Sequence, residues 1–402
     1  MRFLTSVVFA AIASLVVSES VAQQRFTIDA SPAPASQAVG IGRPVFVRPG
    51  TDDHQLRFVS VAAAAVVFED SRGVRRYAID GKIVQSSVTE SAQFLAAIVL
   101  GDASSAQSSE LSLQVFSFDA GPIYRLPLRH DFGEPFPGVS VDERDGSIAL
   151  LHHAEGRVDF YSAAGAIVEE RHVTTGPYEI ERTILASRAR TSGHLAVAVN
   201  EPVTDGVHSV AAGHVRIFNP SGAVENVFEI PQRALSALAI APDGKQIVIG
   251  AYDVPANVYR TTFLDDTGAE LHWIDLAAEV IEFDETGRHV LVSDKRRLSV
   301  VEFDVPRNVL DFQLREESDR VFSSALSPDG NTVVLLVGQA VFTKDHFRHD
   351  DLRVVEFVRV RSGEYISRTR PLDQSAEYVE ANADLWGVSV VLDQRALVFM
   401  RP

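Results

Sequence analysis

The chain has 402 residues, a formal net charge of −17 at pH 7, an apolar fraction of 46% and no cysteine. The absence of thiols excludes disulfides, thiolate metal sites, iron–sulfur clusters, c-type haem and cysteine nucleophiles. The negative charge opposes binding to nucleic-acid phosphates and to anionic lipid, because its long-range field repels both. A chain of this length and apolar content can hold itself together by its core alone.

The first 22 residues have the pattern of a secretory signal peptide. Arg2 precedes an apolar run, and the small residues Ser20 and Ala22 suit cleavage before Gln23. We therefore expect residues 1–22 to be removed and residues 23–61 to form an N-terminal extension and linker. No later stretch is apolar for long enough to cross a bilayer, so we expect a soluble protein in a bacterial periplasm or outside the cell.

From about residue 62 onward, β-rich segments of five to eight residues alternate with turn signals. The segment at 321–337, VFSSALSPDGNTVVLLV, places a Ser-Pro-Asp-Gly turn between two strands. The same unit recurs at 235–250 and more weakly at 280–292, with turn glycines spaced 43 residues apart at Gly244, Gly287 and Gly330. A period in the forties with several short strands is typical of propeller blades.

The second half of each repeat is an apolar strand that ends in an aromatic residue, followed by a turn and another strand, as at 215–230. Near the start, residues 66–79 match this second half of a repeat, but no first-half hairpin precedes them. Residues 385–400 match a first-half hairpin, but no second half follows them. Joining the two predicts an all-β, seven-bladed β-propeller of four-stranded antiparallel blades over residues 62–402, with the last blade closed by N- and C-terminal strands. Eight blades are expected if residues 25–61 supply further strands.

The SPDG and APDG hairpins, each followed by an aromatic strand and a glycine turn, resemble YVTN-type bacterial propellers and the seven-bladed group that includes lactonase-type enzymes. The wider superfold is WD40-like, although the GH and WD dipeptides of WD40 repeats are missing, since Trp273 precedes Ile274 and Trp386 precedes Gly387. The lactonase resemblance implies a metal, or His, Glu and Arg side chains, at the central cavity. The residues on the matching face are His130, His152, Glu179, Asp253 and Arg296.

The long insertions are all expected on one face of the predicted disc, which we call the loop-rich face. They are Gly101–Glu110, Arg129–Pro137, Val173–Thr183, Asn200–Gly213, Ala251–Thr261, Gln339–Asp351 and Pro371–Asp384. Binding residues concentrate on variable loops carried by a rigid scaffold, so this face is the predicted binding face.

One of these loops, FTKDHFRHDD at 342–351, combines imidazoles with carboxylates. Its Asp345, His346, His349 and Asp350 are the candidate ligands for a divalent metal. The alternative is a solvated loop in which basic and acidic side chains pair.

The candidates for ligand binding outside that loop are His130, Asp131, His152, Tyr252, Asp253 and Arg296. Each has an ordinary alternative. For His130 and Asp131 the alternative is an ordered, proline-containing loop, and for His152 it is a hydrogen bond at the end of a strand. For Tyr252 and Asp253 it is a polar side chain that faces solvent, and for Arg296 it is a solvated basic turn.

No serine nucleophile elbow, phosphate-binding glycine loop or HExxH motif is present in the sequence. We therefore expect a monomeric binding or scaffold module that contacts a protein, peptide or glycan through the loop-rich face. The alternative is a propeller hydrolase or lactonase with a metal or His–carboxylate site at the mouth of the channel.

Overall fold

The computed structural model describes residues 42–47, 57–62, 65–70, 73–89, 91, 93–101, 110–130, 134–174, 183–205, 208–305, 307–314, 319–327, 329–342, 347–363, 365–368, 376–381, 387–392 and 395–400, some strand residues by their backbone alone. Every regular element in these residues is a β-strand, and the strands form eight antiparallel sheets. Among them there is no helix with the length and hydropathy of a membrane span.

The first four sheets have four strands each, hydrogen-bonded in chain order. They consist of β1 (Gly42–Val47), β2 (Arg57–Ala62), β3 (Ala65–Asp70) and β4 (Gly73–Ala78); β5 (Lys82–Val88), β6 (Phe94–Leu100), β7 (Leu111–Ser117) and β8 (Gly121–Leu128); β9 (Gly138–Val141), β10 (Ile148–His152), β11 (Arg157–Tyr161) and β12 (Ile167–His172); and β13 (Thr183–Arg188), β14 (Leu195–Asp205), β15 (His208–Phe218) and β16 (Val224–Ile230).

The next three sheets repeat this plan, and the last has three described strands. They consist of β17 (Arg233–Ile240), β18 (Gln246–Asp253), β19 (Val258–Asp265) and β20 (Glu270–Ile274); β21 (Val280–Phe283), β22 (His289–Ser293), β23 (Arg297–Glu302) and β24 (Arg307–Gln313); β25 (Asp319–Leu326), β26 (Thr332–Phe342), β27 (Phe347–Arg359) and β28 (Tyr365–Arg368); and β29 (Ala376–Ala381), β30 (Gly387–Leu392) and β31 (Arg395–Met400).

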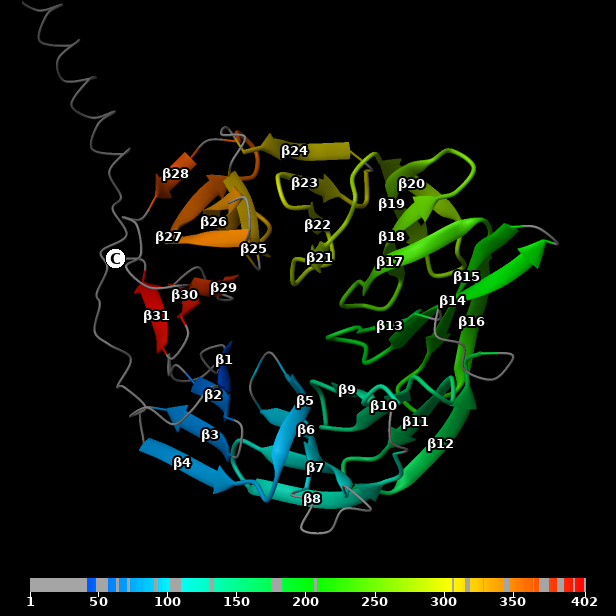
Figure 1. Ribbon diagram of the computed structural model, residues 1–402, viewed down its shortest axis with the longest axis vertical. Helices are drawn as coiled ribbons and strands as arrows, with labels where there is room; N and C mark the ends of the chain where they lie inside the picture. The colour runs from blue at the N-terminus through cyan, green and yellow to red at the C-terminus, as the bar shows by residue number, and fades with distance from the viewer. Residues whose placement is uncertain are drawn as a thin grey trace, which may run out of the picture.

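The sheets follow one another in chain order around a ring, with the first strand of each sheet nearest the centre (Figure 1). The ring brings the first and last sheets together, and β1 contacts both β30 and β31. The predicted all-β propeller of four-stranded antiparallel blades is therefore confirmed.

The way in which the terminal strands are used differs from the prediction. β3 and β4 are present as expected, but they pair with β1 and β2 rather than with strands from the C-terminus. The C-terminal hairpin forms a separate sheet with β29. The shared blade does not form, because the stretch assigned to an extension contains two six-residue strands, and this is the condition under which eight blades were expected. The first of these strands includes Pro44, which argues against a strand when only the sequence is considered.

The turns that defined the repeat form as predicted. Gly330 takes a φ of +68°, and its N–H donates to the carbonyl of Ser327 at 2.8 Å. The Ser327 hydroxyl accepts from the Thr332 N–H at 2.9 Å and donates to Asp329 at 2.6 Å. Burial alone would raise the pKa of Asp329, but hydrogen bonds from Ser327 and Asn331 lower it below its usual value.

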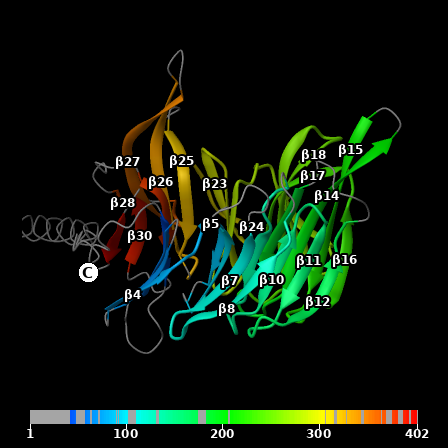
Figure 2. The same ribbon diagram turned by 60° about the horizontal axis from the view of Figure 1, so that its bottom comes forward.

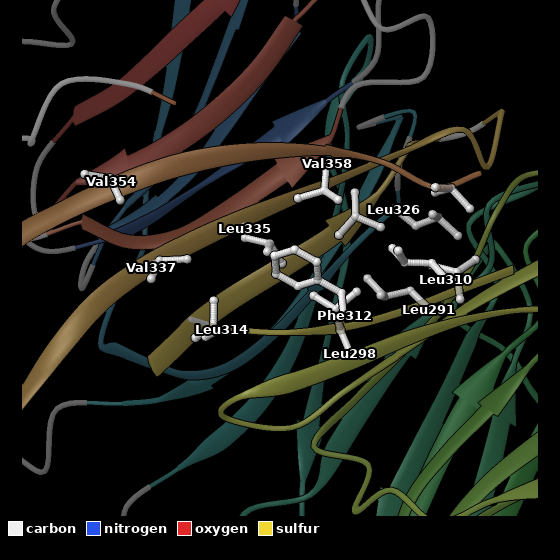
Figure 3. Close-up of a cluster of buried hydrophobic side chains, with 13 residues drawn as sticks. Leu291, Leu298, Leu310, Phe312, Leu314, Leu326, Leu335, Val337, Val354 and Val358 are labelled. Carbon is white, nitrogen blue, oxygen red and sulfur yellow. The ribbon is translucent and has the colours of Figure 1, made fainter. Parts of the chain in front are cut away.

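The hydrophobic core lies between neighbouring sheets rather than inside any one sheet. The cluster in Figure 3, for example, joins Leu291 and Leu298 of one sheet to Leu335 and Val358 of the next, all of them buried. Similar clusters join the other consecutive sheets from the first to the seventh. Because the second to sixth sheets each lie between two of these clusters, their middle strands are almost continuously apolar.

Polar contacts also join the innermost strands. The Ser87 hydroxyl accepts from the Val141 N–H at 3.3 Å, and the Ser187 hydroxyl accepts from the Ile240 N–H at 3.2 Å. Each of these bonds connects one sheet to the next around the ring. They satisfy backbone groups that the sheet ladders leave open at the inner edge.

A buried ion cluster joins the third and fourth sheets. The Asp142 carboxylate, with a fully buried side chain, pairs with Arg144 at 2.9 Å and with Arg188 at 3.0 Å. Burial alone would raise the pKa of Asp142, but the hydrogen bonds from Arg144 and the charges of both guanidinium groups lower it.

Candidate functional site

The predicted loop-rich face is the side of the ring that carries the connections between second and third strands and between successive sheets. Antiparallel pairing places these connections at the same ends of the sheets. Three of the predicted long loops, at 200–213, 251–261 and 339–351, are mostly paired strands, and at 251–261 β18 and β19 pair out to Asp253 and Val258. β14 and β15 pair out to Asp205 and His208, and β26 and β27 pair out to Phe342 and Phe347. These last two pairs are extended ribbons, and they project on the same side in Figure 2.

His152 lies at the end of β10 and is held by the neighbouring strand. Its Nε2 is 2.9 Å from Oδ2 of Asp159, whose other carboxylate oxygen lies 2.9 Å from Nε of Arg157. The side chains of His152 and Asp159 are only 10% and 3% exposed. This arrangement is a buried network within one blade.

His130 and Arg296 lie in two other blades. The His130 ring stacks on Phe136 with 5.1 Å between the ring centroids. Arg296 lies in the turn between β22 and β23, where its N–H donates to Asp294 at 2.6 Å. Asp131 lies outside the described residues. No described contact brings these residues to one another or to His152.

The candidate metal ligands are only partly described. Asp345 and His346 lie outside the described residues, and His349 and Asp350 are described by their backbone on β27, where His349 pairs with Ala340. Elsewhere in the described chain no group of three or more His, Cys, Asp or Glu side chains is arranged to hold a metal ion.

Asp253, by contrast, is the centre of a polar cluster at the loop-rich end of the fifth sheet. Its Oδ2 lies 3.3 Å from Nη1 of Arg260 and 3.8 Å from Nε of Arg233. Its Oδ1 accepts from the Ala256 N–H at 3.0 Å, which fastens the turn between β18 and β19. Arg233 also donates to Thr262 at 3.1 Å. The carboxylate therefore connects three strands and the turn.

Arg260 stacks on Trp273 of the outermost strand. The guanidinium carbon lies 4.4 Å from the indole centroid, in a cation–π contact. Nε of Arg260 lies 3.5 Å from Asp275, whose carbonyl accepts from Arg297 of the next sheet at 3.2 Å. Arg297 pairs with Asp311 at 2.8 Å, and this hydrogen-bonded pairing lowers the pKa of Asp311.

The other side of the same hairpin carries two tyrosines. The rings of Tyr252 and Tyr259 lie 5.0 Å apart, and the Tyr252 hydroxyl donates to the Asn257 side chain. Asn257 has a φ of 57°, a left-handed conformation that asparagine tolerates well in a turn. Adjacent strand residues point to opposite faces, so Tyr259 and Arg260 place their side chains on the two sides of the hairpin.

These residues lie on the two sides of one exposed hairpin end, and together we call them the aromatic surface. Tyr259 is 54% exposed and Trp273 42% exposed, although both are large aromatic residues. The aromatic surface consists of Tyr252, Val254, Val258, Tyr259, Arg260 and Trp273. Trp, Tyr and Arg are the residue types that dominate binding energy at protein interfaces. Here the arginine and both tyrosines are also held in place by neighbouring side chains.

Sequence reasoning selected Tyr252 and Asp253 in this region but missed Arg260 and Trp273. Trp273 comes directly before the buried Ile274 in a short strand, and period-two alternation predicts an exposed position for it. That signal was available in the sequence. The stacking of Arg260 on Trp273 cannot be predicted from the sequence, because it depends on the register between β19 and β20.

Comparison with known proteins finds no matching family model and no matching curated protein. Solved structures do match the fold. The C-terminal WD40 domain of Sif2 has a TM-score of 0.57 at 9% identity, covering 90% of this chain and 97% of that one. The Dos1 propeller has a TM-score of 0.56 at 11% identity, with 90% and 93% covered. The Cps50 (Swd1) propeller domain of Myceliophteria thermophila has a TM-score of 0.50 at 13% identity, with 90% and 98% covered.

At these identities the likeness shows the fold alone. The chain is therefore a β-propeller similar in architecture to WD40 domains, even though it lacks their characteristic dipeptides. The narrower resemblance to YVTN-type and lactonase-type propellers remains a prediction.

Proposed function

We propose that this chain is a protein-binding module that contacts its partner with the aromatic surface on the loop-rich face. One observation carries the proposal: Tyr259, Arg260 and Trp273 are gathered at one hairpin end, and both aromatic rings remain substantially exposed. Burying such side chains against a partner supplies a large apolar contact area, and their polar ends add hydrogen bonds.

The rigidity of the aromatic surface supports the proposal. Arg260 is restrained by Asp253, Asp275 and the indole ring, so it loses little further side-chain freedom on binding. Ordering flexible side chains is one of the main costs of association, and restraint before binding reduces this cost.

Among the partners that the sequence leaves open, a protein fits this surface better than a glycan. A sugar ring needs the flat face of an aromatic ring for stacking, and the guanidinium of Arg260 already covers one face of Trp273. The other face of the Trp273 indole and the rings of Tyr252 and Tyr259 suit the irregular apolar and polar side chains of a protein.

Site-specific photo-crosslinking tests the proposal. A photoreactive amino acid is placed at Tyr259, which is 54% exposed, and for comparison at Ile167 on β12, which is 51% exposed. In extracts of the source organism we expect a discrete protein adduct from position 259 that the Trp273→Ala change abolishes. Adducts that are equal at the two positions, or unaffected by Trp273→Ala, would contradict the proposal.

We further propose that the protein acts after export, on the basis of the signal-peptide pattern of residues 1–22. The test is expression of the full chain in a bacterial host, fractionation, and N-terminal sequencing. The expected product is a periplasmic or secreted protein that begins at Gln23. An uncleaved product that stays in the cytoplasm would contradict export.

A further inference from the structure

The ribbon formed by β14 and β15 extends beyond the other two strands of its sheet. β13 pairs with β14 only as far as Asn200, and β16 pairs with β15 only from Gly213 onward. β14 and β15 continue to pair with each other from Glu201 and Ala212 out to Asp205 and His208. Over this length no described strand pairs with the outer edge of either strand, and Figure 2 shows the ribbon standing clear of the sheet.

The base of the ribbon is fixed to the sheets on both sides. Toward the fifth sheet, the amide of Asn200 bonds the backbone of Leu235 through both its oxygen and its nitrogen, at 2.8 and 2.7 Å. Toward the third sheet, Nε2 of His214 lies 2.8 Å from the carbonyl of Val173. Gly213 lies so close to Leu235 that a Cβ there would be 2.8 Å from its side chain. These contacts therefore fix the base of the ribbon to the third and fifth sheets.

The register shows which backbone groups face outward. Pro202 has no N–H, so its pairing with Ala211 must be a non-hydrogen-bonded pair, in which main-chain groups point away from the partner strand. Alternation then directs the N–H and C=O groups of Ser209 and Ala211 to the outer edge of β15. His208, Val210 and Ala212 use theirs to pair with β14.

The two edges of the ribbon differ in the residues that normally protect an open edge. The β14 edge contains Pro202 and the acidic residues Glu201 and Asp205. The β15 edge reads His-Ser-Val-Ala-Ala at 208–212, with no proline, lysine or acidic residue. Proline and charged residues on an edge strand prevent pairing with another chain, and the β15 edge lacks them.

We propose that the outer edge of β15 over residues 208–212 accepts an extended segment of a partner protein as an added strand. This mode of recognition uses main-chain hydrogen bonds for affinity and side-chain pockets for specificity. The added strand would continue the line of β16, which ends at Ile230 before the chain turns into β17. This site uses residues other than those of the aromatic surface, so the two proposals can fail separately.

The test uses a phage-displayed library of linear peptides, selected on the full-length protein. Binding of the selected peptides is then measured by calorimetry to wild type, Ala211→Pro and Ala211→Ser. Ala211→Pro removes one outward N–H without removing a bond to β14, whereas Ala211→Ser keeps the N–H and serves as the matched control. We expect at least ten-fold weaker binding to Ala211→Pro and less than a two-fold change for Ala211→Ser.

A second measurement does not depend on any variant. Hydrogen exchange of the wild-type protein with and without the peptide should show slower exchange at the Ser209 and Ala211 amides. Thermal unfolding of Ala211→Pro within a few degrees of wild type confirms that it folds.

Three outcomes would overturn the proposal. The first is a library in which no peptide binds the protein. The second is a set of peptides whose affinity for Ala211→Pro equals that for wild type, or whose binding is abolished only by Trp273→Ala. The third is a wild-type dimer in sedimentation that Ala211→Pro converts to monomer, because a second copy of the chain would then occupy the edge.

Discussion

The side-chain amide of Asn200 pairs with the backbone of Leu235 in the next sheet as a neighbouring strand would. Nδ2 donates to the Leu235 carbonyl at 2.7 Å, and Oδ1 accepts from its N–H at 2.8 Å. Leu235 is 4% exposed and lies where the pairing of β17 with β18 shifts register. One side chain therefore satisfies both backbone groups of a buried residue at an irregular point in its strand.

Asn200→Ala should destabilise the fold because it leaves that donor and that acceptor without their partners. Unsatisfied buried groups of this kind cost about 1–3 kcal/mol each, so the two together should cost roughly 2–6 kcal/mol. Urea unfolding monitored by fluorescence measures the change. The exposed Asn308 is the control, and Asn308→Ala should stay within about 0.5 kcal/mol of wild type. A loss that is the same for both variants would contradict the assigned role.

The ion cluster around Asp142 predicts a specific loss of stability in acid. The pKa of Asp142 is lowered in the folded state, so the carboxylate stabilises the fold at pH values above its unfolded pKa of about 3.9. That contribution disappears as the pH falls through the folded value. Asp142→Asn should therefore cost about 3–5 kcal/mol at neutral pH and make the acid limb of the stability profile shallower.

The comparison for this prediction is Asp304→Asn, a change at an exposed position between β23 and β24. Stability measured from pH 7 down to pH 2 should follow wild type for Asp304→Asn and diverge for Asp142→Asn. An Asp142→Asn profile parallel to wild type would show that Arg144 and Arg188 do not act through this carboxylate.

Two turn glycines provide a matched test of packing between sheets. Gly330 and Gly363 have similar φ values, 68° and 63°. A Cβ at Gly330 would lie 2.3 Å from Nδ1 of His289 and 2.7 Å from Asp284, whereas at Gly363 the nearest atom, from Leu310, is 3.4 Å away. Gly363→Ala should cost about 1–2 kcal/mol from backbone strain alone.

Gly330→Ala should cost more than Gly363→Ala, because the new methyl group must also displace the His289–Asp284 pair, whose atoms lie 2.8 Å apart. Thermal unfolding of the two variants measures the difference. Equal melting temperatures would indicate that the pair moves aside without cost.

The sequence predicted the repeated hairpins well because their turns depend on local chemistry. The Ser327–Thr332 turn needs a glycine with positive φ and a hydroxyl that accepts a backbone hydrogen bond, and both residue types can be identified from the sequence. Strand β1 is hard to predict from the sequence because it contains Pro44, which argues against a strand.

The candidate site was less accessible to prediction, because its contacts depend on strand register and on neighbouring sheets. Arg260 and Trp273 meet only once β19 and β20 are paired, and Asn200 meets Leu235 only once two sheets are packed. The sequence predicts loops at the long polar insertions, yet at 200–213 the chain continues as paired strands. The polar and small residues of 200–213 show little hydrophobic alternation, so the pattern there does not indicate strands.

The most direct test of the central claim is the affinity of the partner identified by crosslinking for variants of the aromatic surface. Calorimetric titration of that partner compares wild type, Trp273→Ala and Ile167→Ala, the last a similarly exposed apolar residue on another blade. Loss of an interface hot spot costs at least about 2 kcal/mol, so Trp273→Ala should weaken binding more than ten-fold while Ile167→Ala leaves it unchanged. Equal affinities for all three proteins would show that the partner binds elsewhere on the propeller.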